Sequence, residues 1–169
     1  MESIYIILLS ILIIILLLGK RKYNKHTRNI KKANKIINKL TNLEYPGQKI
    51  KYLRKIDPFV FEELLLTSFK TKGYKIKRNK KYTGDGGIDG IIYDSNKNKI
   101  IIQAKRYSGY VNLQDLYEFN NLVYSNKAYK GYFVHTGKTG KKAHKHFKNS
   151  NIEIISGSSL INLIENKTL

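Results

Sequence analysis

Residues 84–107 read GDGGIDGIIYDSNKNKIIIQAKRY, and this stretch forms the centre of the predicted fold. Two apolar runs, 88–93 and 99–105, are separated by a polar turn at 95–98. Short apolar runs joined by a polar turn are typical of a β-hairpin. We therefore predict two antiparallel strands, and the glycine-rich turn 84–87 leads into the first of them.

Polar side chains occupy the same end of both predicted strands. Gln103 and Lys105 lie on one face because side chains alternate along a strand, and an antiparallel hairpin brings Asp89 beside them. Taken singly, such a lysine more often reaches solvent and such a glutamine more often bonds nearby backbone. Together, a carboxylate, an amide and an ammonium group suit metal-assisted phosphodiester hydrolysis. Asp89, Gln103 and the Ala104 carbonyl would supply oxygen ligands to a hard divalent cation.

A helix is predicted upstream of the hairpin, from Asp57-Pro58 to the stop at Gly73. Its apolar residues share one face at helical spacing, and they are Phe61, Leu64, Leu65, Ser68 and Phe69. Glu62 lies beside this stripe. The alternating residues 74–80 predict a further strand.

Downstream of the hairpin, two more apolar runs predict strands at 130–135 and 152–155. Helices are predicted over 112–126, 139–147 and 158–164. The order over the domain 56–169 is α-β-β-β-α-β-α-β-α. Such an α/β order favours a mixed sheet with helices on both faces and a site at one sheet edge.

Four short motifs in this order resemble those of the Mrr-type (type IV) branch of the PD-(D/E)xK restriction endonucleases. They are Phe61-Glu62, Gly73-Tyr74, the glycine-rich segment 84–90, and the segment QAKRY at 103–107. The resemblance covers about residues 57–166. It implies a restriction-endonuclease-like fold and a deoxyribonuclease that uses Mg²⁺ or Mn²⁺.

The resemblance also assigns expected roles to individual residues. Asp89 matches the metal-binding aspartate, Gln103 the residue that replaces the usual acid, and Lys105 the catalytic lysine. Glu62 matches a first-helix glutamate near the metal. Asp85 is expected to be structural or to support the ligands.

A further similarity covers the strand and turn at 131–137, followed by Ala143. The family's usual Phe-Thr after this turn is replaced here by Thr139-Gly140. The departure affects the turn, so it bears on local DNA contacts more than on catalysis.

The segment after this turn is strongly basic, with lysines at Lys138, Lys141, Lys142, Lys145 and Lys148. These side chains would contact DNA phosphates if the helix borders the cleft, and otherwise form a solvated face; both interpretations stay open.

A phosphate-binding loop is excluded because Gly131 precedes Gly137 by six positions rather than five. The four histidines do not form a metal-ligand pattern and are expected at the surface or facing DNA.

The N-terminal residues 3–19 read SIYIILLSILIIILLLG and contain no charge. As a helix they extend about 25 Å, the short end of what crosses a bilayer core of about 30 Å. No signal-peptide cleavage site follows, and an all-apolar helix suits lipid better than a small core. We therefore expect one transmembrane anchor over 1–19. The basic residues that follow it predict a cytoplasmic C-terminal domain.

Residues 20–55 form the expected basic juxtamembrane linker, with thirteen lysines and arginines against the single acid Glu44. Part of it, around Ala33–Leu40, has helical spacing that would end near Tyr45-Pro46-Gly47. The segment could contact lipid headgroups or DNA phosphates, or serve as a solvated spacer that enforces topology.

Composition supports the same function class. The chain has 169 residues, a formal net charge of +20 and no cysteine. The charge favours a polyanionic partner, and the lack of cysteine excludes thiolate zinc sites and cysteine nucleophiles. We predict a membrane-anchored, metal-dependent endonuclease that acts on double-stranded DNA in restriction of foreign or modified DNA, with a homodimer left open. The alternatives are a non-catalytic membrane-tethered DNA-binding protein and a protein that binds only anionic lipid.

Overall fold

The computed structural model describes residues 2–79 and 86–165, and the side chains of 3–17, 25–79 and 86–165. Gly84 and Asp85 of the predicted turn lie outside the described residues. The helices are α1 (Glu2–Thr41), α2 (Pro46–Leu53), α3 (Pro58–Thr71), α4 (Leu113–Ser125), α5 (Lys141–Phe147) and α6 (Gly157–Ile164). The strands are β1 (Lys75–Lys77), β2 (Gly90–Tyr93), β3 (Lys99–Lys105), β4 (Lys130–His135) and β5 (Ile152–Ile155).

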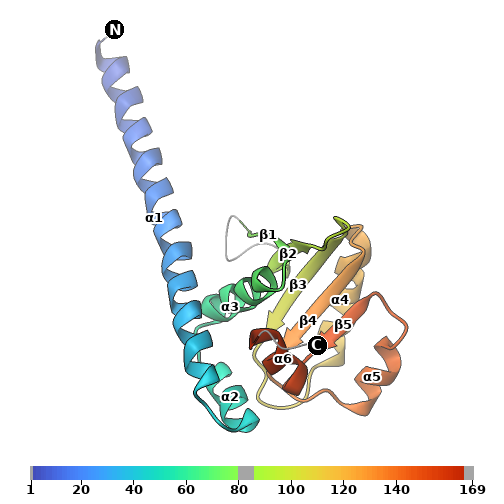
Figure 1. The fold of residues 1–169 in the computed structure, drawn as a ribbon. Helices are drawn as coiled ribbons and strands as arrows, with labels where there is room; N and C mark the ends of the chain where they lie inside the picture. Colours follow the sequence, from blue (N-terminus) through green and yellow to red (C-terminus); the bar gives the residue numbers. More distant parts are fainter. Residues whose placement is uncertain (1, 80–85, 166–169) are drawn as a thin grey trace.

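The five strands form one mixed sheet in the order β1-β2-β3-β4-β5. β1, β2 and β3 pair antiparallel, whereas β3, β4 and β5 pair parallel. The predicted α/β order over 56–169 is confirmed (Figure 1). β1 is shorter than the predicted 74–80, and β2 begins at Gly90 rather than at 88.

The helix α3 begins and ends where its sequence signals predict. The Asp57 side chain accepts hydrogen bonds from the N–H groups of Phe59 and Val60 at 2.9 and 3.2 Å. Gly73 follows the helix with φ +90°, a conformation that costs glycine least. All five residues of the predicted stripe are buried.

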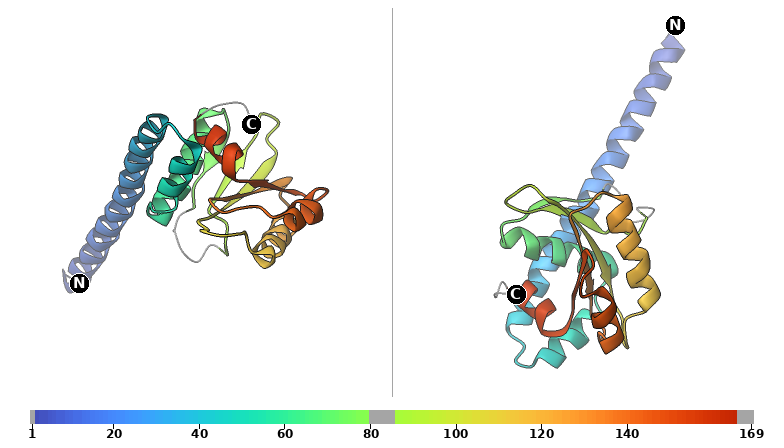
Figure 2. Two further views of the ribbon diagram at one scale, coloured as in Figure 1. Left: turned by 90° about the horizontal axis from the view of Figure 1, so that it is seen from below. Right: turned by 90° about the vertical axis from the view of Figure 1, so that its right-hand side faces the viewer.

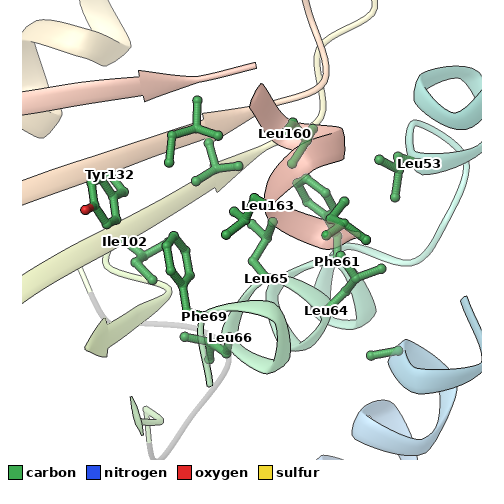
Figure 3. Packing of buried hydrophobic residues seen from close by; sticks show 14 of the residues in the cluster. Leu53, Phe61, Leu64, Leu65, Leu66, Phe69, Ile102, Tyr132, Leu160 and Leu163 are labelled. Carbon is green, nitrogen blue, oxygen red and sulfur yellow. The ribbon is translucent and has the colours of Figure 1, made fainter. Parts of the chain in front are cut away.

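Helices cover both faces of the sheet (Figure 2). α3 and α6, with parts of α1 and α2, pack on one face, and α4 and α5 pack on the other. Ile100 and Ile102 of β3 point to the α3 face, and Ile101 points to the α4 face, as the alternation of a strand requires. Figure 3 shows the α3 side of this core, where Phe61, Leu65 and Phe69 meet α6 and the sheet.

Gly131 has no side chain, which lets α4 pack closely on β4. A Cβ atom at this position would lie 2.4 Å from Val123 Cγ2 and 2.7 Å from Phe119 Cε1. We expect Gly131→Ala to lower the free energy of unfolding by about 1–3 kcal/mol, because both contacts are with packed core side chains. Gly109→Ala, whose Cβ meets nothing within 4 Å, is the control in urea unfolding. Equal midpoints for the two variants would contradict this expectation.

The N-terminal part of α1 extends away from the rest of the molecule (Figure 1). Its large apolar side chains between Ile4 and Leu17 are 48–68% exposed. Within the described part of the chain, no helix combines the length and the apolar character that a membrane crossing requires. The structure therefore does not confirm the span predicted for 3–19, and the side chains of 18 and 19 are not described.

The C-terminal part of α1 packs against α3. Asn29, Ala33 and Leu40 are buried at this contact. α2 lies against α6, and Lys49 forms an ion pair with Glu165. The expected linker is therefore helical over most of its length and is packed onto the domain that follows, while the boundary at residue 55 stays a prediction.

Candidate active site

Asp89 is held against the backbone of β3. Its N–H donates to the Ile102 carbonyl at 2.8 Å, and its Oδ2 accepts from the Ala104 N–H at 2.6 Å. The carboxylate thus lies at the segment that carries Gln103 and Lys105. The structure brings these three residues together, as the hairpin predicted.

Gln103 is a buried polar residue, with 8% of its surface exposed. Its Oε1 finds no hydrogen-bond partner among the described residues. A Cβ at Gly87 would lie 2.9 Å from Gln103 Nε2, and Gly87 has φ +88°. The backbone can approach the Gln103 amide this closely because residue 87 is a glycine. A buried oxygen without a hydrogen-bond partner destabilises the folded state, so a ligand is expected at this atom.

Lys105 is the last residue of β3 and is partly buried. It lies on the same face as Gln103 because it is two residues further along the strand. Its carbonyl accepts from the Thr136 N–H at 3.2 Å, which joins the end of β3 to the segment after β4. Ala104, between the two, packs against the α3 face of the core.

Glu62 comes from α3 and is partly buried. The helix approaches the Asp89 segment through Leu66, because a Cβ at Gly90 would lie only 2.6 Å from Leu66 Cδ2. Glu62 precedes Leu66 by four residues, so it lies on the same side of α3, about 6 Å along the axis. That Glu62 reaches a metal held at Asp89 stays a prediction.

Glu63 forms an ion-pair cluster that the sequence did not indicate. Its side chain is 1% exposed and bonds to His26 Nδ1 at 2.8 Å and to Arg78 Nε at 2.7 Å. His26 belongs to α1 and Arg78 follows β1, so the cluster joins three segments. His26 was expected at the surface, and its side chain is 20% exposed while it pairs with Glu63.

His135 is buried, with no exposed surface, so the expectation that it lies at the surface or faces DNA is wrong. Its Nδ1 accepts from the Gly137 N–H at 3.1 Å, so Nε2 carries the proton and donates to Thr139 Oγ1 at 3.1 Å. Burial, and secondly the nearby His144, lower the pKa of the His135 imidazole to about 4. His144 is exposed, as expected, and so is His146.

The buried imidazole makes stability depend on pH. Its pKa rises to the ordinary 6.5 on unfolding, so the unfolded chain takes up a proton between pH 6.5 and about 4 that the folded chain does not bind. This contribution is complete above pH 6.5 and is lost as the pH falls toward 4. We expect it to amount to up to about 3 kcal/mol, measured as the difference in unfolding free energy between wild type and His135→Gln at pH 7 and pH 4. His146→Gln is the control, and an unchanged pH dependence in His135→Gln would contradict the assignment.

Comparison with known proteins decides the family. The model of the Mrr catalytic domain, described as a restriction endonuclease, matches residues 53–164. The chain belongs to the Mrr-type restriction endonuclease family. It is 32% identical over 124 residues to the type IV methyl-directed restriction enzyme EcoKMrr of Escherichia coli strain K12, a match of 68% of this chain and 40% of the relative.

Two solved structures share the fold of this Mrr-type chain. One is the MspJI restriction endonuclease in complex with a 27-mer oligonucleotide, with TM-score 0.55 and 20% identity over 71% of this chain and 31% of that chain. The other is the DNA modification-dependent restriction endonuclease AspBHI, with TM-score 0.56 and 17% identity over 72% of this chain and 35% of that chain. The chain thus spans less than half the length of these relatives.

The candidate site can be compared with the oxygen ligands that a divalent cation requires. Among the described residues, no three histidine, aspartate or glutamate side chains gather closely enough to hold a metal. The candidate ligands therefore need neutral oxygens beside carboxylates: Asp89, Gln103 Oε1, the Ala104 carbonyl and Glu62. The unpaired Oε1 fits this set, because carboxylate and carbonyl oxygens are the ligands that hard cations prefer.

The lysines after β4 present their side chains to solvent. Lys138, Lys141, Lys142 and Lys145 are exposed, while Ala143 and Phe147 anchor α5 on the sheet. Their contact with DNA stays a prediction.

Proposed function

We propose that this chain is a metal-dependent endonuclease that hydrolyses phosphodiester bonds of double-stranded DNA. The observation that carries the proposal is the buried Gln103 Oε1, which has no hydrogen-bond partner within residues 2–79 and 86–165 and lies on the strand that fixes the Asp89 carboxylate and ends at Lys105. A merely structural glutamine at this depth would be expected to have a donor for that oxygen.

The five candidate residues have two proposed roles. Asp89, Gln103, the Ala104 carbonyl and Glu62 would hold Mg²⁺ or Mn²⁺, which when bound supplies charge stabilisation and a more acidic water. Lys105 would orient the attacking water or offset the negative charge that develops on the phosphate. The Ala104 N–H fixes the Asp89 carboxylate before substrate arrives, so little reorganisation is needed.

The proposed biological role is restriction of foreign or modified DNA. It is supported by family membership and by two similar proteins, the methyl-directed restriction enzyme EcoKMrr and the modification-dependent endonuclease AspBHI. The test therefore includes plasmids with and without methylation.

The deciding experiment is plasmid cleavage by the full chain in mild detergent with Mg²⁺. Asp89→Asn should abolish cleavage because it removes the negative charge of the carboxylate. The amide oxygen can still accept from the Ala104 N–H, so the local structure should be kept. Asp94→Asn, in the turn at the far end of β2, is the matched control. Nicked or linear product that needs Asp89 and disappears with EDTA supports the proposal; the ratio of the two forms tells single-strand from double-strand cutting. DNA binding without cleavage of either plasmid would instead favour a non-catalytic tether.

We further propose that the apolar segment 3–19 attaches the protein to the membrane with the nuclease domain in the cytoplasm. Its support is the exposed apolar surface between Ile4 and Leu17, followed directly by basic residues. Ile13→Arg should release the chain from membranes during alkaline carbonate extraction, whereas Ile13→Leu should not, because arginine at the helix centre costs about 3 kcal/mol. Release of the wild-type chain would refute the attachment.

A further inference from the structure

We propose that the segments 107–111 and 136–140 form a rigid ridge that contacts DNA beside the catalytic residues, with Tyr110 and Lys138 at its tip. The inference rests on the proposed function and extends it from chemistry to substrate contact. We call the two segments together the Tyr110–Lys138 ridge.

The position of the ridge follows from the sheet. The first segment leaves β3 directly after Lys105, and the second leaves β4 directly after His135. Lys105 and His135 are paired in register, so both segments start at the same edge of the sheet. DNA bound at Lys105 therefore has the ridge as its neighbour.

Backbone contacts make the two segments one unit. The Lys138 N–H donates to the Gly109 carbonyl and the Val111 N–H donates to the Lys138 carbonyl, both at 2.9 Å. The Thr136 hydroxyl donates to the Tyr107 carbonyl at 3.0 Å. A surface loop joined in this way loses little conformational entropy when it binds a ligand.

Gly137 allows this close approach. A Cβ at Gly137 would lie 2.5 Å from the Gly109 carbonyl oxygen and 2.7 Å from Tyr107 Cβ. The glycine of the Thr136-Gly137 turn is therefore required by the neighbouring segment, which the sequence pattern alone did not indicate.

The tip presents an aromatic ring and a cation to solvent. Tyr110 is 69% exposed, although the next residue, Val111, is buried. The Lys138 ammonium lies 5.9 Å from the centre of the Tyr110 ring. No acidic residue occurs in 106–112 or 136–148, and the basic α5 follows at once.

These features fit DNA better than an anionic lipid surface or an acidic protein. DNA offers phosphates to the lysine and sugar or base surfaces to the ring, and the ridge adjoins the residues proposed to cut it. The apolar segment of α1 extends on the α3 side of the domain, whereas Tyr107 and Val111 of the ridge pack with α4 and α5 on the other side (Figure 2). A lipid surface that holds α1 would therefore lie away from the ridge.

The test measures affinity of the full chain for a fluorescent DNA duplex in EDTA, so that binding is read without cleavage. Tyr110→Ala should weaken binding by about 5- to 20-fold, as expected for loss of an aromatic contact to nucleic acid. Tyr124→Ala and Tyr129→Ala, which remove similarly exposed tyrosines elsewhere, should change it less than about twofold. Tyr110→Phe should retain most of the affinity because it keeps the ring.

Lys138→Ala should weaken binding and reduce the slope of affinity against salt concentration by about one counterion. Lys75→Ala, at the opposite edge of the sheet, should leave the slope unchanged. If Tyr110→Ala binds as tightly as Tyr124→Ala, the ridge proposal is wrong even when the wild type cleaves plasmid. If the wild type binds DNA through Tyr110 but never cleaves it, the endonuclease proposal fails and the ridge stands.

Discussion

Replacing Lys105 by alanine is expected to slow DNA cleavage by about 100- to 1,000-fold, the usual loss when one electrostatic stabiliser of a transition state is removed. Lys105 ends β3 on the face that carries Gln103, next to the Asp89 carboxylate. Its partly buried position contributes little to the core, so the variant should fold and bind DNA nearly as the wild type does. The measurement is the initial rate of plasmid nicking at saturating DNA with Mg²⁺.

The matched control for this prediction lies on the same strand. Lys99→Ala removes the lysine that begins β3 and bonds the Asn126 carbonyl at 2.9 Å, far from the candidate site. It should keep the cleavage rate within about threefold of wild type while losing some stability. A Lys105→Ala enzyme that cuts as fast as Lys99→Ala would remove Lys105 from the catalytic set.

The second large effect concerns stability. Arg78→Ala is expected to lower the free energy of unfolding by about 3 kcal/mol, because it removes one partner of a buried carboxylate. Glu63 is 1% exposed and would lose its bond to the Arg78 guanidinium. Urea unfolding of the full chain, followed by circular dichroism, gives the difference.

Lys130→Ala provides the control for the ion-pair cluster. It breaks the Lys130–Glu153 pair, whose side chains are 38% and 46% exposed, and should cost less than about 1 kcal/mol. Adding Glu63→Gln to Arg78→Ala should recover part of the lost stability, because the buried negative charge is then absent. Equal effects of Arg78→Ala and Lys130→Ala would mean that the cluster stabilises no more than a surface pair.

The cluster has a consequence for architecture. The family match begins at residue 53, so α1 lies outside it. His26 nevertheless binds the carboxylate next to Glu62 on α3. The N-terminal helix is therefore part of the support of the helix that presents a candidate ligand.

The sequence predicted β3, β4 and β5 with their observed bounds, because each is a short apolar run between turn signals. It also located α3 from the Asp57-Pro58 start and the Gly73 stop. β1 was predicted too long because alternation continues beyond the residues that pair with β2. These signals are local, which is why neighbouring residues suffice to read them.

The sequence by itself determined the α/β order and the residue types of the candidate site. Asp89, Gln103 and Lys105 could be placed together because a hairpin has few registers. Only the tertiary structure decided that Gln103 Oε1 is buried without a partner in the part of the chain that the structure describes, that Glu63 and His135 are buried, and that the segments after β3 and β4 join into a ridge. Burial and long-range pairing depend on which distant segments pack against a residue. The residues adjacent to it in the sequence do not indicate those segments.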